Sequence, residues 1–263
     1  MKGFKKDPRQ LDSAGSSIER IQTGVESALQ ELNRRGVMSK TPPKARKSEL
    51  TRQKILDAAL ESFLEHGFEA TTMKMIAERA GVSMGNAYYY FASKDALMVG
   101  YYSSLSASFQ DKAQPVLASE KTFTDRLRKV LEAWVENARP SHEFARSYFR
   151  YAADPTSPLS PFSEASKHVR EQSIDVYRQV TEGSEKLRIP HDVRRQLPEL
   201  LWLYQMALVL YWVYDESVDQ ARTLALIDRT VPLLAKLLNM SRVPGLRSVA
   251  SDFMTAVEDF KSF

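Results

Sequence analysis

The sequence has no cysteine among its 263 residues and only four histidines. Disulfide bonds, thiolate metal sites and cysteine nucleophiles are therefore excluded. The histidines lack the spacing of metal ligands, and the chain has neither a glycine-rich phosphate loop nor a serine in a nucleophile elbow. These absences argue against an enzyme, and they predict no cofactor and no metal. The histidines are scattered: His66, His142, His168 and His191.

Long apolar segments are also missing. The first residues, MKGFKKDPRQLDS, carry charges without an apolar core segment, which predicts that they are no secretory signal. The longest apolar run, Leu200 to Tyr214, covers 15 residues and is interrupted by Gln205. A membrane-spanning helix needs about 20 apolar residues. We therefore expect a cytoplasmic protein with no membrane partner.

Strand signals are absent, and helical patterns follow one another from end to end, so the sequence predicts an all-α fold. Pro42 and Pro43 should prevent helix continuation and leave SKTPPKARKS as a linker. Pro198 should kink or split the helix that contains it, and Pro232 should bend its own. The expected helices are Ser16–Arg35, Arg52–His66, Met73–Ala80, one opened by Ser83, one from Ser93 to about Gln114, Phe123–Ala138, Glu143–Ala152, Ser163–Thr181, Asp192–Tyr214, Gln220–Leu238 and Leu246–Phe260.

Positive charge is concentrated at the start of the chain. Residues 1–50 hold 11 Lys and Arg against 6 Asp and Glu, whereas the remaining 213 residues have a net charge of −1. Lys40, Lys44, Arg46 and Lys47 cluster just before the first strong helix. Such a basic arm suits a polyanion such as nucleic acid, and a solvated tail is the alternative interpretation.

Two short helices joined by a tight turn follow this arm. Thr72 can cap the first helix and Ser83 the second, with Gly81 between them. This pattern is typical of a helix-turn-helix. It places the stretch GVSMGNAYYYF, with three consecutive tyrosines, at the start of the second helix.

A projection at about 100° per residue assigns this stretch to two faces. Met84, Ala87, Tyr88 and Phe91 share the face expected to pack on Ile76 and Phe63. The opposite, solvent face holds Gly85, Asn86, Tyr89 and Tyr90. A major groove would explain that second face, because glycine permits close approach, an amide can pair with a base edge and phenols can bond phosphates or bases. Burial of the two tyrosines under a later helix is the alternative.

The segment RQKILDAALESFLEHGFEATTMKMIAERAGVSMGNAYYYFASKDALMVGYY, Arg52 to Tyr102, closely resembles the DNA-binding domain of TetR-family transcriptional regulators. The resemblance rests on many residues at fixed spacing over about a fifth of the chain: Ile55, Ala59, Phe63, Gly67, Phe68, Thr71, Thr72, Ile76, Ala77, the AGVS turn, Gly85, Tyr88, Phe91, Lys94 and Leu97.

The resemblance implies a set of DNA contacts. Thr72 and Ser83 would bond phosphate at helix starts, and Lys94 would clamp another phosphate. Met84, Gly85 and Asn86 would face base edges. The DNA backbone or bases would be contacted by Tyr88, Tyr89 and Tyr90. The domain itself is not basic, since Thr51 to Gly100 holds 5 basic and 6 acidic residues. Affinity should therefore depend partly on the arm.

The resemblance also implies a domain order and a function. Residues 47–98 would form the three-helix DNA-binding domain, and 99–241 a helical effector-binding and dimerisation domain. The helical patterns of the sequence itself add an extension at 1–46, with a possible amphipathic helix and basic linker, and a C-terminal amphipathic helix at 242–263. A repressor that a small-molecule effector releases from a palindromic operator is implied. The candidate effector lining is aromatic, with ordinary core as the alternative: Tyr102, Phe109, Trp134, Tyr148, Phe149 and Tyr177.

A homodimer is expected from the late helices. The run Leu200–Tyr214 is apolar around its whole circumference, so it must be buried on all sides, and its own domain can cover only part of it. The helix at 220–238 adds an apolar stripe at near-heptad spacing: Leu224, Ile227, Val231, Leu234 and Leu238. Helices 192–214 and 220–238 of two subunits would form a four-helix interface, with a thick monomeric core as the alternative.

A rival function is a helix-turn-helix scaffold that serves as a protein-binding adaptor without effector control.

Overall fold

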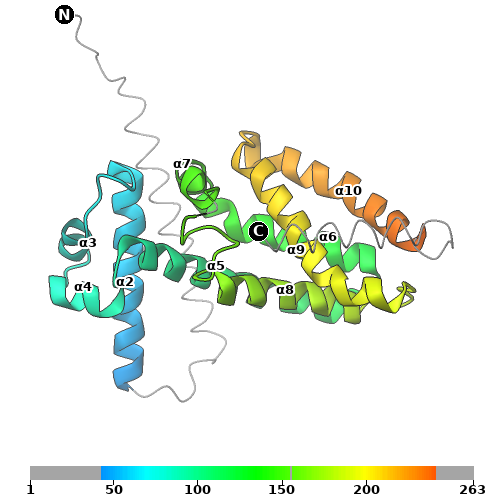
Figure 1. The fold of residues 1–263 in the computed structure, drawn as a ribbon, viewed down its shortest axis with the longest axis horizontal. Coiled ribbons are helices and arrows are strands. Elements are labelled where there is room, and N and C mark those ends of the chain that lie inside the picture. Colours follow the sequence, from blue (N-terminus) through cyan, green and yellow to red (C-terminus); the bar gives the residue numbers. More distant parts are fainter. Residues whose placement is uncertain (1–42, 155, 241–263) are drawn as a thin grey trace, which may run out of the picture.

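A computed structural model describes residues 43–154 and 156–240. Within these residues every regular element is a helix, which confirms the all-α class (Figure 1). Helices α2 to α4 lie at one end of the molecule, and α5 runs from them into a body that contains α6, α8, α9 and α10. The expected helices Ser16–Arg35 and Leu246–Phe260, and Lys40 of the basic arm, lie outside the described residues.

Helix α2 (Pro43–His66) begins nine residues earlier than expected. Proline is well tolerated as the first residue of a helix, because the N–H that it lacks would have no intrahelical partner there. Lys44 and Lys47 therefore lie in α2, and the prediction that SKTPPKARKS is a linker is wrong for its second half. The expected end of the helix is confirmed, because Gly67 adopts a φ of 81°, in the left-handed region that glycine favours.

Helices α3 (Met73–Arg79) and α4 (Met84–Tyr90) form the predicted pair, and both predicted caps are present. The hydroxyl of Thr72 accepts the backbone N–H of Met75 at 3.2 Å, and that of Ser83 accepts the N–H of Asn86 at 3.1 Å. Gly81 turns the chain between them with a φ of 65°. Local sequence therefore determines both ends of this turn.

Helix α5 (Lys94–Ser119) is longer than expected, because it continues past Pro115. A proline removes its own N–H from the helical ladder and crowds the carbonyl four residues before it, and burial of Ala113 and Leu117 on either side offsets this cost. The N-cap expected at Ser93 is present, since its hydroxyl accepts the N–H of Ala96 at 3.1 Å. One unbroken helix thus connects the two ends of the molecule.

The remaining helices follow the expected order with small shifts at their ends. Of the kink or split expected at Pro198, the split is wrong, because Pro198 lies buried inside an unbroken α9. Pro232 likewise lies inside a continuous α10. The buried ring of Pro198 packs in the interior, which offsets the lost hydrogen bond. The elements are α6 (Phe123–Ala138), η1 (Arg139–Ser141), α7 (His142–Ala152), α8 (Lys167–Glu182), α9 (His191–Val213), η2 (Val218–Gln220) and α10 (Ala221–Met240).

Two hydrophobic cores hold these helices together. The first core joins α2, α3, α4 and the start of α5, and α7 adds Phe144 and Tyr148 to it. The rings of Phe63 and Phe144 stack with centroids 6.1 Å apart, and Phe68 meets Tyr148 edge-on at 5.3 Å. The second core joins the rest of α5 with α6, α8, α9 and α10. Helix α7 therefore packs against the helix-turn-helix unit although it follows α6 in the chain.

Candidate nucleic-acid interface

Helix α4 is exposed along most of its length. Ala87 is fully buried and packs in the first core, whereas the side chain of Tyr89 is 81% exposed. Met84 and Tyr88 are 44% and 48% exposed. This seven-residue helix thus presents three large side chains outward at once. Neighbouring exposed apolar side chains of this kind are typical of an interaction site.

The expected division of this helix into two faces is only partly right. Ala87 and Phe91 are buried as expected, but Met84 and Tyr88 are exposed, and Tyr90 is half-buried instead of exposed. Met84 and Tyr90 both lie three positions from Ala87, about 60° away on opposite sides of the helix. Sequence spacing alone cannot decide which of these two sides the neighbouring helices cover.

A contact with α2 explains why Tyr90 is half-buried. Its hydroxyl hydrogen-bonds the hydroxyl of Ser48 at 3.0 Å, and its ring meets that of Tyr89 edge-on with centroids 5.2 Å apart. A helix that began at Arg52, as the sequence predicts, would not bring Ser48 beside α4. This contact holds Ser48, and with it the adjacent Lys47, near the C-terminal end of α4.

The two N-cap hydroxyls are exposed and remain free to donate. Thr72 and Ser83 each accept a backbone N–H, which uses the oxygen as an acceptor and leaves its O–H available. They open α3 and α4, the two helices of the helix-turn-helix. Gly85 follows in α4, and an added Cβ there would meet no atom within 4 Å. Asn86, next in the chain, is half-buried.

Lys94 is tied into the protein. Its ammonium donates to the carbonyl oxygen of Phe68 at 2.6 Å and to that of Glu69 at 3.2 Å, and it lies 4.6 Å from the centroid of the Phe68 ring. These contacts fix the start of α5 to the loop between α2 and α3. One of the three N–H groups is left for a phosphate, so the expected clamp would also position that loop.

Other basic side chains of this unit are paired with acidic ones. Arg79 forms ion pairs with Glu65 and Glu61, and Lys74 lies 3.9 Å from Glu78. Arg52 pairs with Glu49 at 3.7 Å and lies over the Phe91 ring, 5.2 Å from its centroid. The near-neutral charge of the unit is therefore organised into intramolecular pairs, which leaves few cations for phosphates.

The six candidate effector residues do not surround one cavity, because they are divided between the two cores. Tyr102 and Tyr148 belong to the first core, with ring centroids 6.3 Å apart. Phe149 packs on the second core and meets Tyr214 at 6.1 Å. The other three, Phe109, Trp134 and Tyr177, are buried members of the second core.

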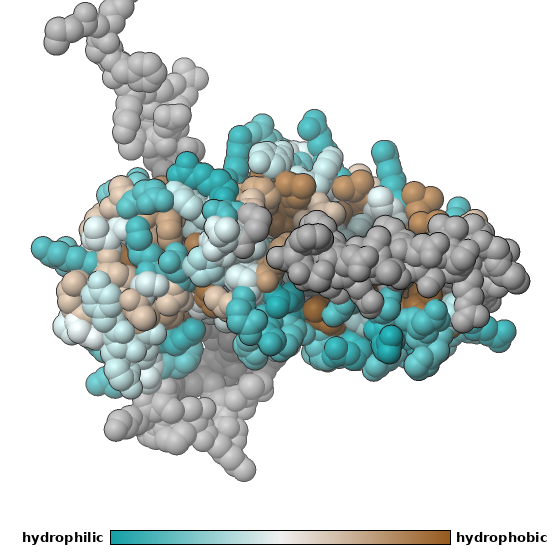
Figure 2. Space-filling view, viewed as in Figure 1, coloured by the Kyte–Doolittle hydropathy of each residue, from teal (hydrophilic) through white to brown (hydrophobic). Residues whose placement is uncertain are grey.

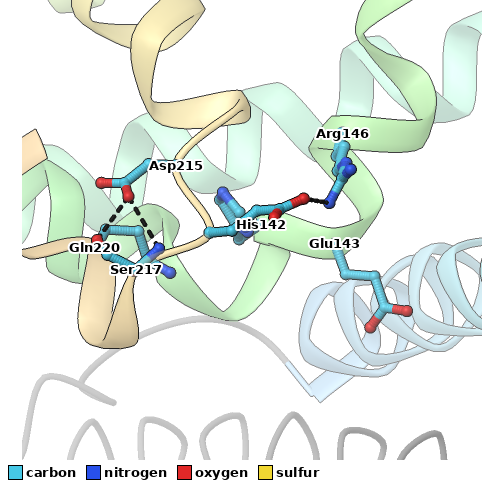
Figure 3. Close-up of a pocket in the computed structure, with 7 residues that line it drawn as sticks. His142, Glu143, Arg146, Asp215, Ser217 and Gln220 are labelled. Carbon is cyan, nitrogen blue, oxygen red and sulfur yellow. Dashed lines mark hydrogen bonds and ion pairs between the residues drawn. The ribbon is translucent and has the colours of Figure 1, made fainter. Parts of the chain in front are cut away.

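Two surface pockets are not predicted by the sequence. One, of about 330 Å³, lies between α7 and the turn from α9 to α10 (Figure 3), and the other, of about 340 Å³, lies near the ends of α5 and α8. In the first, Glu143 points away from Asp215. Burial would raise the pKa of Asp215, but hydrogen bonds from Ser217 and Thr223 outweigh it and lower the pKa to about 2. None of the six aromatic candidates lines either pocket.

The second core contains polar atoms that have no hydrogen-bond partner among the described residues. They are the hydroxyl of Tyr177, Oε1 of Gln205 and Nε1 of Trp212, in side chains no more than 3% exposed. Burial raises the pKa of Tyr177 well above its usual value of 10, so the phenol remains neutral. Gln205 and Trp212 are not among the residues predicted from the sequence, although Gln205 is the one polar amide in an apolar helix.

Helices α9 and α10 also expose apolar side chains, and hydrophobic residues gather along this side of the molecule (Figure 2). The stripe predicted for the interface, however, faces the chain's own second core: Ile227 and Val231 are fully buried, and Leu234 packs on them. The exposed set comprises Leu210, Tyr211, Tyr214, Leu233, Leu237 and Met240.

Membrane and metal chemistry find no support in the described part of the chain. None of its helices is long and apolar enough to cross a membrane. Residues 43–154 and 156–240 bring together no group of three or more His, Asp or Glu side chains that could hold a metal ion.

Two family models match the sequence. Residues 55–100 match the model described as bacterial regulatory proteins, tetR family. Residues 126–255 match the model described as tetracyclin repressor-like, C-terminal domain. Together they cover the helix-turn-helix unit and most of the helical body.

Individual relatives agree with these models. The regulator YhgD of Bacillus subtilis is 30% identical over 100 residues, which are 38% of this chain and 52% of YhgD. The repressor KstR2 of Mycobacterium tuberculosis is 30% identical over 141 residues, 50% of this chain and 68% of KstR2. The chain thus spans about half the length of YhgD and two thirds that of KstR2.

Among solved structures, the transcriptional regulator FadR of Bacillus subtilis in complex with stearoyl-CoA is similar in fold. Its TM-score is 0.55 with 20% sequence identity, over 70% of this chain and 97% of that one. At this identity the likeness concerns the fold alone.

Proposed function

The chain belongs to the TetR family of bacterial transcription regulators, which are not enzymes, and we propose that it is a homodimeric repressor that leaves a palindromic operator when a small molecule binds. It would act in the cytoplasm, where the DNA lies. The observation that carries this proposal is the outward face of α4, where Met84, Tyr88 and Tyr89 are exposed.

A major groove gives each part of this face a partner. B-DNA admits an α-helix there, and its base edges offer donors, acceptors and thymine methyl groups. Met84, Gly85 and Asn86 at the start of α4 would meet base edges, while the hydroxyls of Thr72 and Ser83 would donate to phosphates. The phenols would contact the backbone or bases: Tyr88, Tyr89 and Tyr90.

Phosphate contacts would also come from the first turns of α2. The hydrogen bond between Ser48 and Tyr90 holds the second of these turns beside α4. They carry Lys44, Arg46 and Lys47, in a protein whose helix-turn-helix cations are largely paired. Cations that neutralise phosphates release counterions and make binding salt-dependent. The arm would therefore supply sequence-independent affinity, and α4 would supply specificity.

Alanine at Asn86 or Tyr89 tests the DNA-binding face. Each variant should weaken operator binding by about 1–3 kcal/mol, because each loses a contact that only DNA supplies. Only Asn86→Ala should alter the base preference. The measurement is a binding titration against an operator selected from random DNA, with circular dichroism to show that the fold is intact.

Tyr89→Phe is the matched control, because it keeps the ring and removes only the hydroxyl. Lys167→Ala on α8 is a second control, because it changes an exposed residue far along the chain from α4. Parental affinity in both Asn86→Ala and Tyr89→Ala would show that α4 is not the reading helix. It would favour the protein-binding adaptor.

The effector would bind within the second core. A buried polar group without a hydrogen bond costs about 1–3 kcal/mol, so evolution rarely retains one without a use. Tyr177, Gln205 and Trp212 each hold such an atom, and a bound molecule could satisfy them. The aromatic side chains of the same core, Phe109 and Trp134, would supply apolar contact.

The other three aromatic candidates fit this site less well. Tyr102 and Tyr148 belong to the first core and would not share its lining. Phe149 is only partly buried where it packs on the second core, and its ring meets Tyr214. The proposed effector site therefore retains Phe109, Trp134 and Tyr177 from the sequence prediction.

Tyr177→Phe tests this effector site even while the ligand is unidentified. It removes an unpartnered buried hydroxyl, so the free protein should gain about 1 kcal/mol in its free energy of unfolding. The same variant should lose effector response, measured as release of operator DNA. Stearoyl-CoA, found in the FadR structure, is the first probe.

Tyr204→Phe is the matched control, because the hydroxyl of Tyr204 hydrogen-bonds that of Thr230. Its removal should lower the free energy of unfolding. If urea titrations show that Tyr177→Phe is as destabilised as Tyr204→Phe, the hydroxyl of Tyr177 has a structural partner and the proposed site is wrong.

A further inference from the structure

Met84 occupies an unusual position for a methionine. It is the first residue of α4, and its side chain is 44% exposed. On one side lies the exposed cap Ser83, and on the other Gly85, whose Cβ position is open.

The chemistry of methionine limits what it can read. Its thioether is flexible and apolar, with sulfur as a weak acceptor and no donor. Among the base edges of the major groove, the thymine C5-methyl is the apolar feature. We propose that Met84 reads a thymine methyl group in each operator half-site. This inference rests on the proposed DNA-binding function and specifies one of its contacts.

The arrangement of α4 supports separate roles for its neighbours. Tyr88 lies one turn after Met84, about 40° away in projection, so the two side chains form one exposed apolar strip. Asn86 lies about 200° from Met84, so its amide points to a different part of the site. Apolar readout by Met84 and polar readout by Asn86 would therefore fall on different base pairs.

Few basic side chains of the helix-turn-helix unit are free to read bases in place of α4. Arg79 and Lys74 are paired with glutamates, and Lys94 is bonded to backbone carbonyls. A bidentate arginine–guanine contact is the commonest specific contact in protein–DNA complexes, but these side chains would have to break their pairs to form one. These pairs favour specificity from the groups that α4 presents, and Met84 is the first of them.

Replacement of thymine by deoxyuridine tests the proposal directly, because deoxyuridine lacks only the methyl group. The operator is first selected from random DNA with the full-length protein, and thymines are then replaced one symmetric pair at a time. The parent should lose affinity at one pair, by about fourfold per half-site and about fifteenfold for the dimer, as expected for one buried methyl.

The variants then assign that loss to one residue. Met84→Ala should bind the thymine and deoxyuridine operators equally, whereas Met84→Leu should keep the discrimination. Asn86→Ala is the matched control, because it should weaken binding yet retain the parental response to deoxyuridine. Since Met84 is exposed, these variants should fold as the parent does, which circular dichroism checks.

Two results would overturn the inference while leaving the proposed function intact. One is a parent that is insensitive to every deoxyuridine pair. The other is Met84→Ala that retains the parental discrimination. Failure to select any operator would instead refute DNA reading by α4, and the Met84 contact with it.

Discussion

A variant with aspartate at both Leu233 and Leu237 is expected to be monomeric and to bind the operator at least about 100-fold more weakly than the parent. These leucines are 54% and 61% exposed on α10 and lie one turn apart, on the same side of the helix. They are not needed for the chain's own core, so the monomer should fold. Two carboxylates buried in an apolar interface would be costly.

The loss of DNA binding follows from the two-fold symmetry of the proposed complex. A dimer holds its second reading head at a high effective concentration once the first is bound, and a monomer forfeits that gain. Light scattering measures the mass, with 29.9 kDa expected for the variant. A parent that is itself a 29.9 kDa particle yet binds a palindrome would refute the dimer. Ala107→Asp with Ala118→Asp, both exposed on α5, is the matched control and should stay dimeric.

Gly85→Ala is expected to stabilise the protein and yet weaken operator binding by about tenfold or more, at the lower end of the cost of one lost base contact. Gly85 lies inside α4, and a Cβ there would meet no atom within 4 Å. Glycine in a helix costs roughly 0.5–1 kcal/mol relative to alanine, so the free protein should gain stability by that amount. In the complex, the added methyl group would stand between the helix backbone and the bases and would push α4 outward.

Gly81→Ala is the control for this prediction, because the two glycines lie close together in the chain and both have open Cβ positions. Gly81 has a φ of 65°, where an L side chain is strained by about 1–2 kcal/mol, so this variant should lose stability. Urea unfolding separates the two signs, and a DNA titration gives the affinity. Parental affinity in Gly85→Ala would mean that no base approaches the helix there.

Features decided by neighbouring residues can be predicted from the sequence. The sequence predicts caps at Thr72 and Ser83 and a helix that starts at Ser93, and each of these hydroxyls accepts a backbone N–H from the first turn of its helix. Gly67 ends α2 as expected for the same reason. The start of α2 is not predictable in this way, because proline is compatible both with a linker and with the first turn of a helix.

Features decided by contacts between distant parts of the chain are harder to predict from the sequence. A seven-residue helix with one fully buried side chain, Ala87, does not reveal which flank its neighbours cover, so the projection assigns Met84 and Tyr90 to the wrong faces. Likewise, aromatic content cannot show that Tyr102 and Tyr177 belong to different cores, because the packing of α7 on the first core is a long-range contact. The DNA contacts predicted from the resemblance remain predictions.

Helix α5 contributes to both cores, since Leu97 and Met98 pack in the first and Phe109 and Ala113 in the second. Because the helix is unbroken between them, the boundary predicted after residue 98 crosses a rigid element. Heat that melts one core should therefore destabilise the helix that anchors the other. A molecule that binds only the second core is expected to raise the melting temperature of the helix-turn-helix as well. Thermal melting of the whole protein can thus report ligands before any operator is known.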